Sequence, residues 1–473
     1  MSCDWKKIRV EEIALDSPHA MSTGPFGSAI SSKFFKEDGV PVIRGGNLST
    51  DISSRMSDEG LVFVSKEKAV EFQRSLVRSG DLIFTCWGTI NQVGLINDEL
   101  DYSEYIVSNK QMKLTPDPKK ADSLFLYYLF SSPIKQAEII SNGIGAAVPG
   151  FNLGQLKSHV INLPPIVEQK RIANILYLFD RKIRHSRKIN QTLEQMAQAI
   201  FKSWFVDFEP VKTKIAAIEA GEDAEGVTCA AMRTISGKTD DGLNQMQTEQ
   251  PEHYTQLKTT AELFPAAMQD SELGKVPEGW DGSCFGNVIA QCKTKIKDRS
   301  ATVLSAVASG QLVRSDEHFK KTVYSKSIEK YLAVEKWDFA YNPSRINIGS
   351  IGMYKKDELG AVSPVYVVFK PDVEYRWFID SSLKLNKTKK FINTLASGGV
   401  RQSLSFNDFA SVPSVIPSKD CISIFNLLLE KLETISEAQI NEINTLTNLR
   451  DTLLPKLLSG ELSVDAVDLK EEN

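Results

Sequence analysis

Two long stretches of the chain carry apolar residues at the spacing of one helix face, and each fits a heptad pattern. In the first stretch, one core row, position a, holds Ile172, Phe179, Ser186, Leu193 and Ile200, and the other, position d, holds Ile175, Lys182, Ile189 and Met196. In the second stretch, position a holds Phe425, Leu432, Gln439, Leu446 and Leu453, and position d holds Leu428, Ile435 and Leu449. The pattern predicts a long amphipathic helix in each stretch.

The two predicted helices also share their phase. Their patterns match at an offset of 253 residues (425 − 172), and both have a polar residue at the third a position, Ser186 and Gln439. We therefore expect the helices to pair along one seam as a coiled coil, with the polar pair helping to fix their register. The alternative is two unrelated amphipathic helices, each docked on its own domain.

The remaining apolar pattern is that of short strands and turns. Strand-like runs come before a predicted helix over Ser123–Ile140, which Asn142-Gly143 should end. These runs are Val40–Arg44, Leu61–Val64, Asp81–Thr85 and Gln111–Leu114. Further along, Ala361–Phe369 reads as a strand and Leu383–Ala396 as a helix. Both regions therefore have strands followed by a helix.

The two regions are related by an internal repeat at a constant offset. Val107-Ser108 corresponds to Val362-Ser363, 255 residues later (362 − 107). Pro116-Asp117, Gly143, Phe151-Asn152 and Val160-Ile161 recur at the same offset, as Pro371-Asp372, Gly398, Phe406-Asn407 and Val415-Ile416. A repeat of this length predicts an α/β (α+β) protein with two similar domains, each followed by a long helix.

These patterns divide the chain into six parts. Between the first helix and the second domain, the chain is rich in Gly, Thr, Glu and Gln and weakly periodic, so we expect a partly ordered connector. The expected parts are residues 1–163 (first domain), 164–209 (first long helix), 210–269 (acidic connector), 270–416 (second domain), 417–462 (second long helix) and 463–473 (acidic tail).

The composition is that of a soluble globular protein, with 42% hydrophobic and 25% charged residues. No apolar run is long enough to span a membrane, and the first ten residues lack the apolar region of a signal peptide. The six cysteines and five histidines are scattered, with no Cys-x-x-Cys pair, which disfavours a zinc site. We expect a reduced, cytoplasmic protein that binds no metal.

The net charge of −4 conceals an uneven distribution. Between Phe205 and Lys275 there are 13 acidic and 6 basic residues, whereas between Trp280 and Val415 there are 20 basic and 13 acidic. A basic second domain is suited to binding phosphates. The alternative is that these lysines simply form a solvated surface.

Several segments, in a fixed order along nearly the whole chain, resemble the specificity subunit of type I restriction-modification enzymes. In the first half they are Thr23–Ser28 (TGPFGS), Pro41–Asn47 (PVIRGGN), Leu163–Gln169 (LPPIVEQ) with Ile172 and Asp180, and Ile200–Pro210 (IFKSWFVDFEP). In the second half they are Asp270–Trp280 (DSELGKVPEGW) and Leu449–Leu462 (LRDTLLPKLLSGEL). The second domain departs from the pattern, because it lacks the TGPFGS loop and has Ile416–Asp420 where a PPxxEQ segment is expected.

The resemblance implies two target-recognition domains, each reading one half of a split double-stranded DNA sequence. It also implies that the helices set the spacing of these domains and bind two methylation subunits, with restriction subunits in the same complex. Catalysis, S-adenosylmethionine, ATP and Mg²⁺ would then belong to the partner subunits, and this chain would hold no cofactor.

Motifs for chemistry in this chain are weak. No Asn/Asp-Pro-Pro-aromatic motif of a methyltransferase and no P-loop occurs, and the glycines of Gly143–Gly150 have the wrong spacing for a dinucleotide loop. Asp338, near Glu335-Lys336, fits a nuclease pattern poorly. A self-contained methyltransferase or nuclease and a coiled-coil scaffold with degenerate domains are the alternatives to a DNA-binding subunit.

Candidate DNA contacts are side chains with donors or acceptors that lie next to turn signals, or in a basic run. They are Arg44, Asn47, Asn91, Gln92 and Asn152 in the first domain, and Lys293, Lys295, Lys297, Arg299, Arg345, Asn347, Arg401 and Gln402 in the second. Gly24, Pro25 and Gly27 should shape a turn, and Trp87, Trp204 and Trp337 should be core or interface aromatics.

One apolar group at the end of the first helix is a candidate surface for the methylation subunits. It consists of Trp204, Phe205 and Phe208. Large aromatic residues often dominate the energetics of an interface. The alternative is that they pack internally, at the end of the coiled coil.

Overall fold

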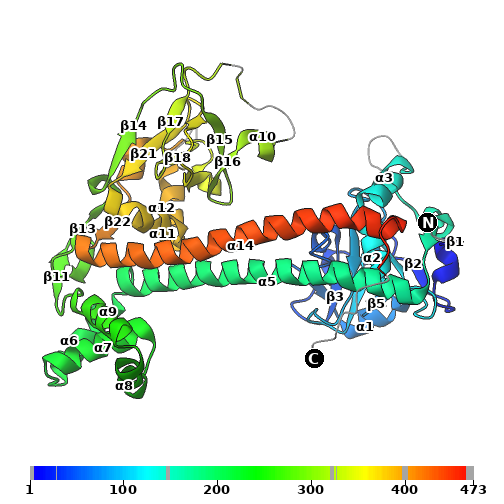
Figure 1. Ribbon diagram of the computed structural model, residues 1–473, viewed down its shortest axis with the longest axis horizontal. Coiled ribbons are helices and arrows are strands. Elements are labelled where there is room, and N and C mark those ends of the chain that lie inside the picture. The colour runs from blue at the N-terminus through cyan, green and yellow to red at the C-terminus, as the bar shows by residue number, and fades with distance from the viewer. Residues whose placement is uncertain are drawn as a thin grey trace. The chain divides into compact units, whose positions relative to one another are not determined.

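The computed structural model describes residues 5–27, 29–144, 150–319, 324, 325, 327–396 and 403–464, in two compact units. Unit 1 contains residues 1–189 and 438–473, and unit 2 contains residues 190–437. Figure 1 shows the elements of both. None of the described helices combines the length and apolarity needed to span a membrane.

Unit 1 is built on two four-stranded sheets. The first has the order β2-β9-β6-β7 and the second the order β4-β3-β8-β5. The strands are β2 (Met21–Thr23), β3 (Val40–Ile43), β4 (Val62–Val64), β5 (Leu76–Arg78), β6 (Leu82–Thr85), β7 (Val93–Leu95), β8 (Glu104–Val107) and β9 (Gln111–Leu114). Among the described strands of these two sheets, β3 and β8 form the one parallel pair.

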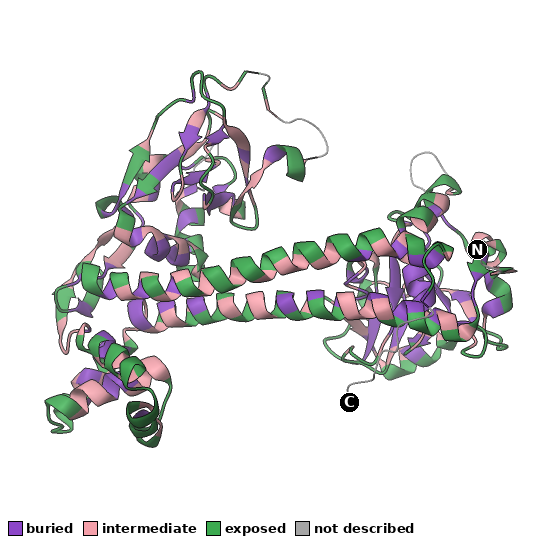
Figure 2. Ribbon diagram, in the orientation of Figure 1, coloured by how far each residue is buried: buried purple, intermediate pink, exposed green. Residues whose placement is uncertain are grey.

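Successive side chains of β6 point in opposite directions, so this strand contributes to two layers of the core of unit 1. Leu82 and Phe84 point to a layer shared with the helices, whereas Ile83 joins Val77 and Val107 between the sheets. Every residue of β6 is buried. Figure 2 shows buried residues in the sheets of this unit. The helices of this unit are α1 (Lys66–Val70), α2 (Ser123–Ser131), α3 (Pro133–Ser141) and α4 (Leu153–Ser158), and β1 (Lys6–Arg9) pairs with β10 (Val160–Leu163).

Unit 2 repeats this topology. Its sheets have the orders β14-β21-β18-β19 and β16-β15-β20-β17, again with one parallel pair, β15 with β20. The strands are β14 (Ile289–Cys292), β15 (Thr302–Val307), β16 (Gln311–Arg314), β17 (Leu332–Val334), β18 (Phe339–Tyr341), β19 (Ile351–Met353), β20 (Gly360–Val362) and β21 (Val367–Pro371). The predicted duplication of an α/β domain is therefore confirmed.

One further strand pair and several helices of unit 2 also have counterparts in unit 1. Helices α10 (Ser315–His318), α11 (Arg376–Lys384), α12 (Asn386–Ala396) and α13 (Phe406–Ala410) accompany the sheets, β11 (Met268–Ser271) pairs with β12 (Gly274–Pro277), and β13 (Asp281–Cys284) pairs with β22 (Pro413–Ile416). The β13–β22 pair matches β1–β10, and α11 and α12 match α2 and α3.

Three predicted elements are divided in the structure. The helix predicted over 123–140 breaks at Ser132, which ends α2 and caps α3, because Pro133 cannot continue an α-helix. The helix predicted over 383–396 is divided at Leu385, which is extended, into the last two residues of α11 and the whole of α12. The strand predicted over 361–369 is β20 and β21, separated by a turn that contains Pro364.

The connector predicted to be partly ordered is helical, so that expectation is wrong. It forms α6 (Glu209–Glu219), α7 (Ala224–Ser236), α8 (Asp240–Glu249) and α9 (Pro251–Glu262). Asp223 and Thr239 cap α7 and α8, and Gly237 ends α7 in the left-handed conformation. The small core of these helices includes Ala231 and Ala261, and alanines leave little hydrophobic periodicity in a sequence.

The two long helices are α5 (Ile166–Phe205) and α14 (Lys419–Ser459), and the boundary between the units falls within both. Inside unit 1 they run antiparallel, because Asp180 contacts Arg450 and Ser186 contacts Glu442. The predicted pairing is thus confirmed there. Ser186, however, donates to Glu442, and the Oε1 atom of Gln439 is buried with no hydrogen-bond partner in the described chain.

The a positions of the heptads are correct, but the d positions are wrong by one residue. Lys182 and Met196 are exposed, whereas the residues that follow them, Ile183 and Ala197, are buried. The same shift occurs in α14, where Ile435 is 47% exposed and Leu429 is buried. In each helix the seam therefore consists of two rows, the a positions and the residues four positions after them. Arg450 belongs to the second row.

The seam of unit 1 contains a buried ion pair. The Nη1 atom of Arg450 lies 2.8 Å from Oδ1 of Asp180, and the hydroxyl of Tyr128 on α2 donates to Oδ2 at 2.6 Å. Asp180 is fully buried and Arg450 is 4% exposed. Burial raises the pKa of Asp180, and the hydrogen bonds from Tyr128 and Arg450 oppose that rise.

We predict that Arg450→Ala destabilises the protein by about 3–5 kcal/mol, because it leaves the Asp180 carboxylate buried without its counter-charge. Lys182→Ala is the control, since its pair with Glu442 is half exposed and should contribute less than about 1 kcal/mol. Denaturant unfolding measures both. Equal losses in the two variants would contradict the prediction.

Candidate nucleic-acid interface

Four connections of unit 1 lie next to one another at one end of its sheets. The Nδ2 atom of Asn109 donates to the carbonyl of Gly27 (3.3 Å), and the backbone N–H of Ser108 donates to Ile43 (3.0 Å). The N–H of Cys86 donates to the carbonyl of Lys110 (2.7 Å). The β8–β9 turn thus joins the segments that follow β2, β3 and β6.

The segment after β2 has the turn role predicted for its glycines. A Cβ atom at Gly24 would lie 1.9 Å from the carbonyl oxygen of Ser108, so no larger residue fits. Gly27 has a φ of 59°, in the left-handed region that favours glycine. Between them stands Phe26, which is 73% exposed and lies under the guanidinium of Arg74.

A pocket of about 560 Å³ opens between these connections. Two predicted residues, Arg44 and Gln92, line it, together with Trp87, Lys110 and Gln111. None of the described residues that line it is acidic. Sequence reasoning missed Lys110 and Gln111, although both stand close after the repeated Val107-Ser108. Trp87 is 51% exposed, so it is not a core aromatic, and the other expected role, that of an interface aromatic, stays a prediction.

Asn47 does not belong to an exposed interface. Its side chain is buried, with Oδ1 accepting from the N–H of Arg44 (3.0 Å) and Nδ2 donating to the carbonyls of Ser57 (3.2 Å) and Glu59 (3.0 Å). All of its donors are therefore used inside the fold. The prediction that Asn47 contacts DNA is corrected to a structural role in holding the loop after β3.

The other candidates of unit 1 differ in exposure and in the hydrogen bonds that they make within the fold. Arg44 is exposed, and its Nη2 donates to the carbonyl of Gly60 (3.0 Å). Gln92 is half-buried and donates to Leu48 (2.9 Å), which ties it to the loop below the pocket. Asn91 is half-buried on the same connection. Exposed Asn152 caps α4, since its Oδ1 accepts from Gln155 (2.9 Å).

In unit 2 the basic run occupies the connection that follows β14, the counterpart of the segment after β2. Lys293, Lys295 and Lys297 are exposed and form no ion pair within the described residues, while Ile296 between them is buried. Arg299 is also exposed, but its guanidinium donates to the carbonyls of Ile296 (3.2 Å) and Lys295 (3.0 Å). The three lysines are therefore presented to solvent by a loop that Arg299 braces.

The remaining candidates of unit 2 are more dispersed. Arg345 is exposed on the β18–β19 connection, the counterpart of the one that carries Trp87. Asn347 lines a separate pocket of about 330 Å³ beside α11 and α12. Arg401 and Gln402 lie outside the described residues.

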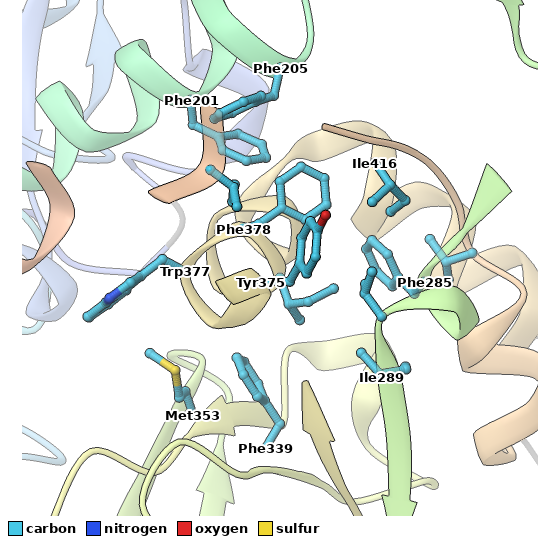
Figure 3. Close-up of a cluster of buried hydrophobic side chains, with 14 of the residues drawn as sticks. Phe201, Phe205, Phe285, Ile289, Phe339, Met353, Tyr375, Trp377, Phe378 and Ile416 are labelled. Carbon is cyan, nitrogen blue, oxygen red and sulfur yellow. The ribbon is translucent and has the colours of Figure 1, made fainter. Parts of the chain in front are cut away.

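The aromatic group at the end of α5 is part of the core of unit 2. Trp204 and Phe205 are 2% and 4% exposed, and Phe205 packs against Phe378 and Phe425, with ring centroids 5.9 and 5.1 Å apart. Figure 3 shows Phe205 and Phe378 in this cluster. Half-buried Phe208 packs on Trp280. The prediction of an exposed partner surface is wrong for Trp204 and Phe205, and the alternative, internal packing, describes them.

Asp338 is a buried acid of unit 2. Its Oδ2 accepts from the N–H of Glu335 (2.8 Å), its Oδ1 has no partner in the chain as described, and burial raises its pKa to about 6. Among the described residues, no group of three His, Cys, Asp or Glu side chains is arranged to hold a metal. The half-buried Trp337 beside it has a φ of 74° and lies under the guanidinium of Arg376.

Known proteins match the chain over most of its length. Residues 4–195 match the model of the type I restriction modification DNA specificity domain. The type I restriction enzyme HindI specificity subunit of Haemophilus influenzae is 30% identical over 423 residues, which cover 82% of this chain and 88% of that protein. The MjaIX specificity subunit of Methanocaldococcus jannaschii is 25% identical over 89% of this chain and 88% of its own length.

A solved structure agrees with the fold. The crystal structure of the type I restriction-modification system S subunit from M. genitalium aligns with a TM-score of 0.52 and 14% sequence identity, covering 96% of each chain. At that identity the match supports the architecture alone. The identity and coverage of the Haemophilus influenzae relative, together with the duplicated domain and paired long helices, show that this chain belongs to the family of type I restriction enzyme specificity subunits.

Proposed function

We propose that this chain is the DNA-recognition subunit of a type I restriction-modification complex and that it reads a two-part, asymmetric site. The observation that carries the proposal is one topology built twice with unlike loops. The segment after β2 presents Phe26, and its counterpart after β14 presents three lysines. Because the two reading surfaces differ, the two halves of the DNA site should differ as well.

Catalysis is assigned to partner subunits in this proposal. Two methylation subunits and the restriction subunits would bring S-adenosylmethionine, ATP and Mg²⁺, and this chain would bring the sequence preference. Apolar side chains on the outer faces of the long helices support a docking role for those helices. In unit 2 Leu427 and Ile435 are 55% and 47% exposed, and in unit 1 Leu449 is 48% exposed. Exposed apolar side chains of this kind suit a protein interface.

Two alternatives make different predictions. A self-contained methyltransferase or nuclease would act on DNA without partners, so the purified chain with S-adenosylmethionine or Mg²⁺ separates it from the proposed function. A scaffold with degenerate domains would show no preference for any sequence in a random DNA pool. The three lysines after β14, which form no ion pair within the described part of the chain, favour a DNA-binding surface over the scaffold.

The length of the paired helices should set the gap between the two half-sites. One heptad inserted in α5 after Ile189 and one in α14 after Glu437 keep the seam in phase and add about 10 Å. At about 3.4 Å per base pair, the gap should lengthen by about three base pairs, with both half-sites unchanged. Sequencing the methylated sites of cells with the lengthened subunit and its partners measures the gap.

A single heptad inserted in α5 alone is the control, because it leaves the two helices unmatched and should abolish methylation. New half-site sequences with the original gap would show that the helices do not set the spacing. Methylated sites with only one specific half would overturn the two-part reading itself.

We predict that Lys293→Gln, Lys295→Gln and Lys297→Gln together lower the salt dependence of DNA binding. Each lost phosphate contact should reduce the slope of log affinity against log salt by about 0.9. Arg299 is kept because it braces the loop. The control variant carries Lys336→Gln, Lys370→Gln and Lys419→Gln, the same change of charge at ion-paired lysines. Equal salt slopes in the two variants would show that Lys293, Lys295 and Lys297 do not contact DNA.

Asp338 should make the protein less stable as the pH rises. Its folded pKa of about 6 exceeds the ordinary value of an aspartate, so the folded state holds a proton that the unfolded state releases between about pH 4 and 6. The stability that protonated Asp338 contributes to the folded state is therefore lost as the pH rises from about 4 to 6. Asp338→Asn should raise stability at pH 7 relative to pH 4.5, measured by denaturant unfolding. An unchanged pH profile would contradict this.

A further inference from the structure

The floor of the pocket in unit 1 is a buried amide with an unused donor. Gln111 is fully buried, and its Oε1 accepts from the hydroxyl of Ser108. Its Nε2 has no acceptor anywhere in the described chain. A buried donor without a partner is costly and rare in folded proteins, so this one calls for an explanation.

Unit 2 shows how the same position is closed. The repeat offset of 255 places Tyr366 where Gln111 stands, and the pairings Val42–Ile106 and Val303–Ala361 place Ala306 where Gly45 stands. The hydroxyl of Tyr366 accepts from the N–H of Ala306 (3.4 Å), which seals the floor. In unit 1, Gly45 and Gln111 occupy these two positions, and the Nε2 atom of Gln111 has no acceptor within the described residues.

The walls of the pocket suit an aromatic ligand that carries a negative charge. The indole of Trp87 is half exposed, and the cations Arg44 and Lys110 stand on the rim. The described lining contains no aspartate or glutamate. A nucleotide has all three matching features, namely a stacking face, acceptors on the base and a phosphate.

The concave shape decides how a nucleotide could enter. Stacked base pairs show their edges on the floor of a groove, which a protruding loop can reach but the floor of a pocket cannot. A base reaches a pocket only when it leaves the stack. A backbone phosphate could enter the pocket, but it would not stack on the Trp87 indole and would not need a donor as deep as Gln111 Nε2.

We infer that the pocket of Trp87 and Gln111 binds one nucleotide of the first half-site, swung out of the DNA stack. The base lies against the Trp87 indole, Gln111 Nε2 donates to an acceptor on it, and Lys110 and Arg44 lie toward its phosphate. Gln111 is then a specificity-determining residue. This inference rests on the proposed function and names the part of the DNA that this site takes.

The test uses the full chain without methylation subunits, so that a base swung out by a partner cannot contribute. Duplexes carrying the identified target are given a single mismatch at each position of the first half-site in turn. Breaking a pair removes part of the cost of extrusion, so affinity should rise about fivefold or more at one position alone.

The key variant combines Gly45→Ala with Gln111→Tyr, the residues that seal the floor in unit 2. At Gly45 the new methyl group meets Gln92 and Gln111 at 3.7 and 3.8 Å, which are ordinary contacts, so the fold should tolerate it. We expect this variant to melt normally, to bind the intact target at least tenfold more weakly and to lose the gain from the mismatch. Val70→Ala, at a 63% exposed position of α1 that does not line the pocket, should behave like the original protein.

Each outcome bears on the inference. Sequence-specific binding without a mismatch gain at any position overturns it and leaves the proposed function intact. A variant that keeps the gain also overturns it, because the pocket is then not the binding site. If the variant fails to fold, Trp87→Ala tests the same pocket at its exposed wall, and this variant should also lose the affinity gain from the mismatch. Absence of any sequence preference in the original chain would defeat the proposed function as well.

Discussion

The ion pair between Asp180 and Arg450 constrains more of unit 1 than any other contact. Both oxygens of the carboxylate are bonded, one to Arg450 and one to Tyr128, so three helices must meet in one register. A buried charge tolerates little error in that geometry, because each lost bond leaves it unsolvated. The apolar seam allows the helices to associate, and the ion pair selects how they do so.

Unit 2 joins its parts of the long helices without an equivalent ion pair among the described residues. Glu433 stands 253 residues after Asp180, but it pairs with Lys355 on the domain and not with the other long helix. There the helix ends are joined by Phe201, Phe205 and Phe425, whose rings contact one another. One unit therefore has a polar, directional joint and the other an apolar one, although both arise from the same repeat.

The sequence predicted the features that repeat or have a strong period, and it failed where single contacts decide. The duplicated domain and the long helices follow from patterns over many residues. The wrong d positions, the helical connector and the internal role of Asn47 could not be foreseen. Each depends on which atoms meet after folding, and Asn47 beside two glycines looks like any loop residue. Gln111 was missed because only its surroundings show that its donor is unused.

The partners of the buried pair lie 270 residues apart, which has a consequence for how the protein is made. A ribosome adding about 5–20 residues per second needs about 15–55 seconds to go from Asp180 to Arg450. During that time the first domain can assemble its sheets, but its last helix has no counter-charge for Asp180. The nascent first unit is therefore incomplete until the whole of unit 2 has been synthesised, and its exposed seam must be kept from aggregating meanwhile.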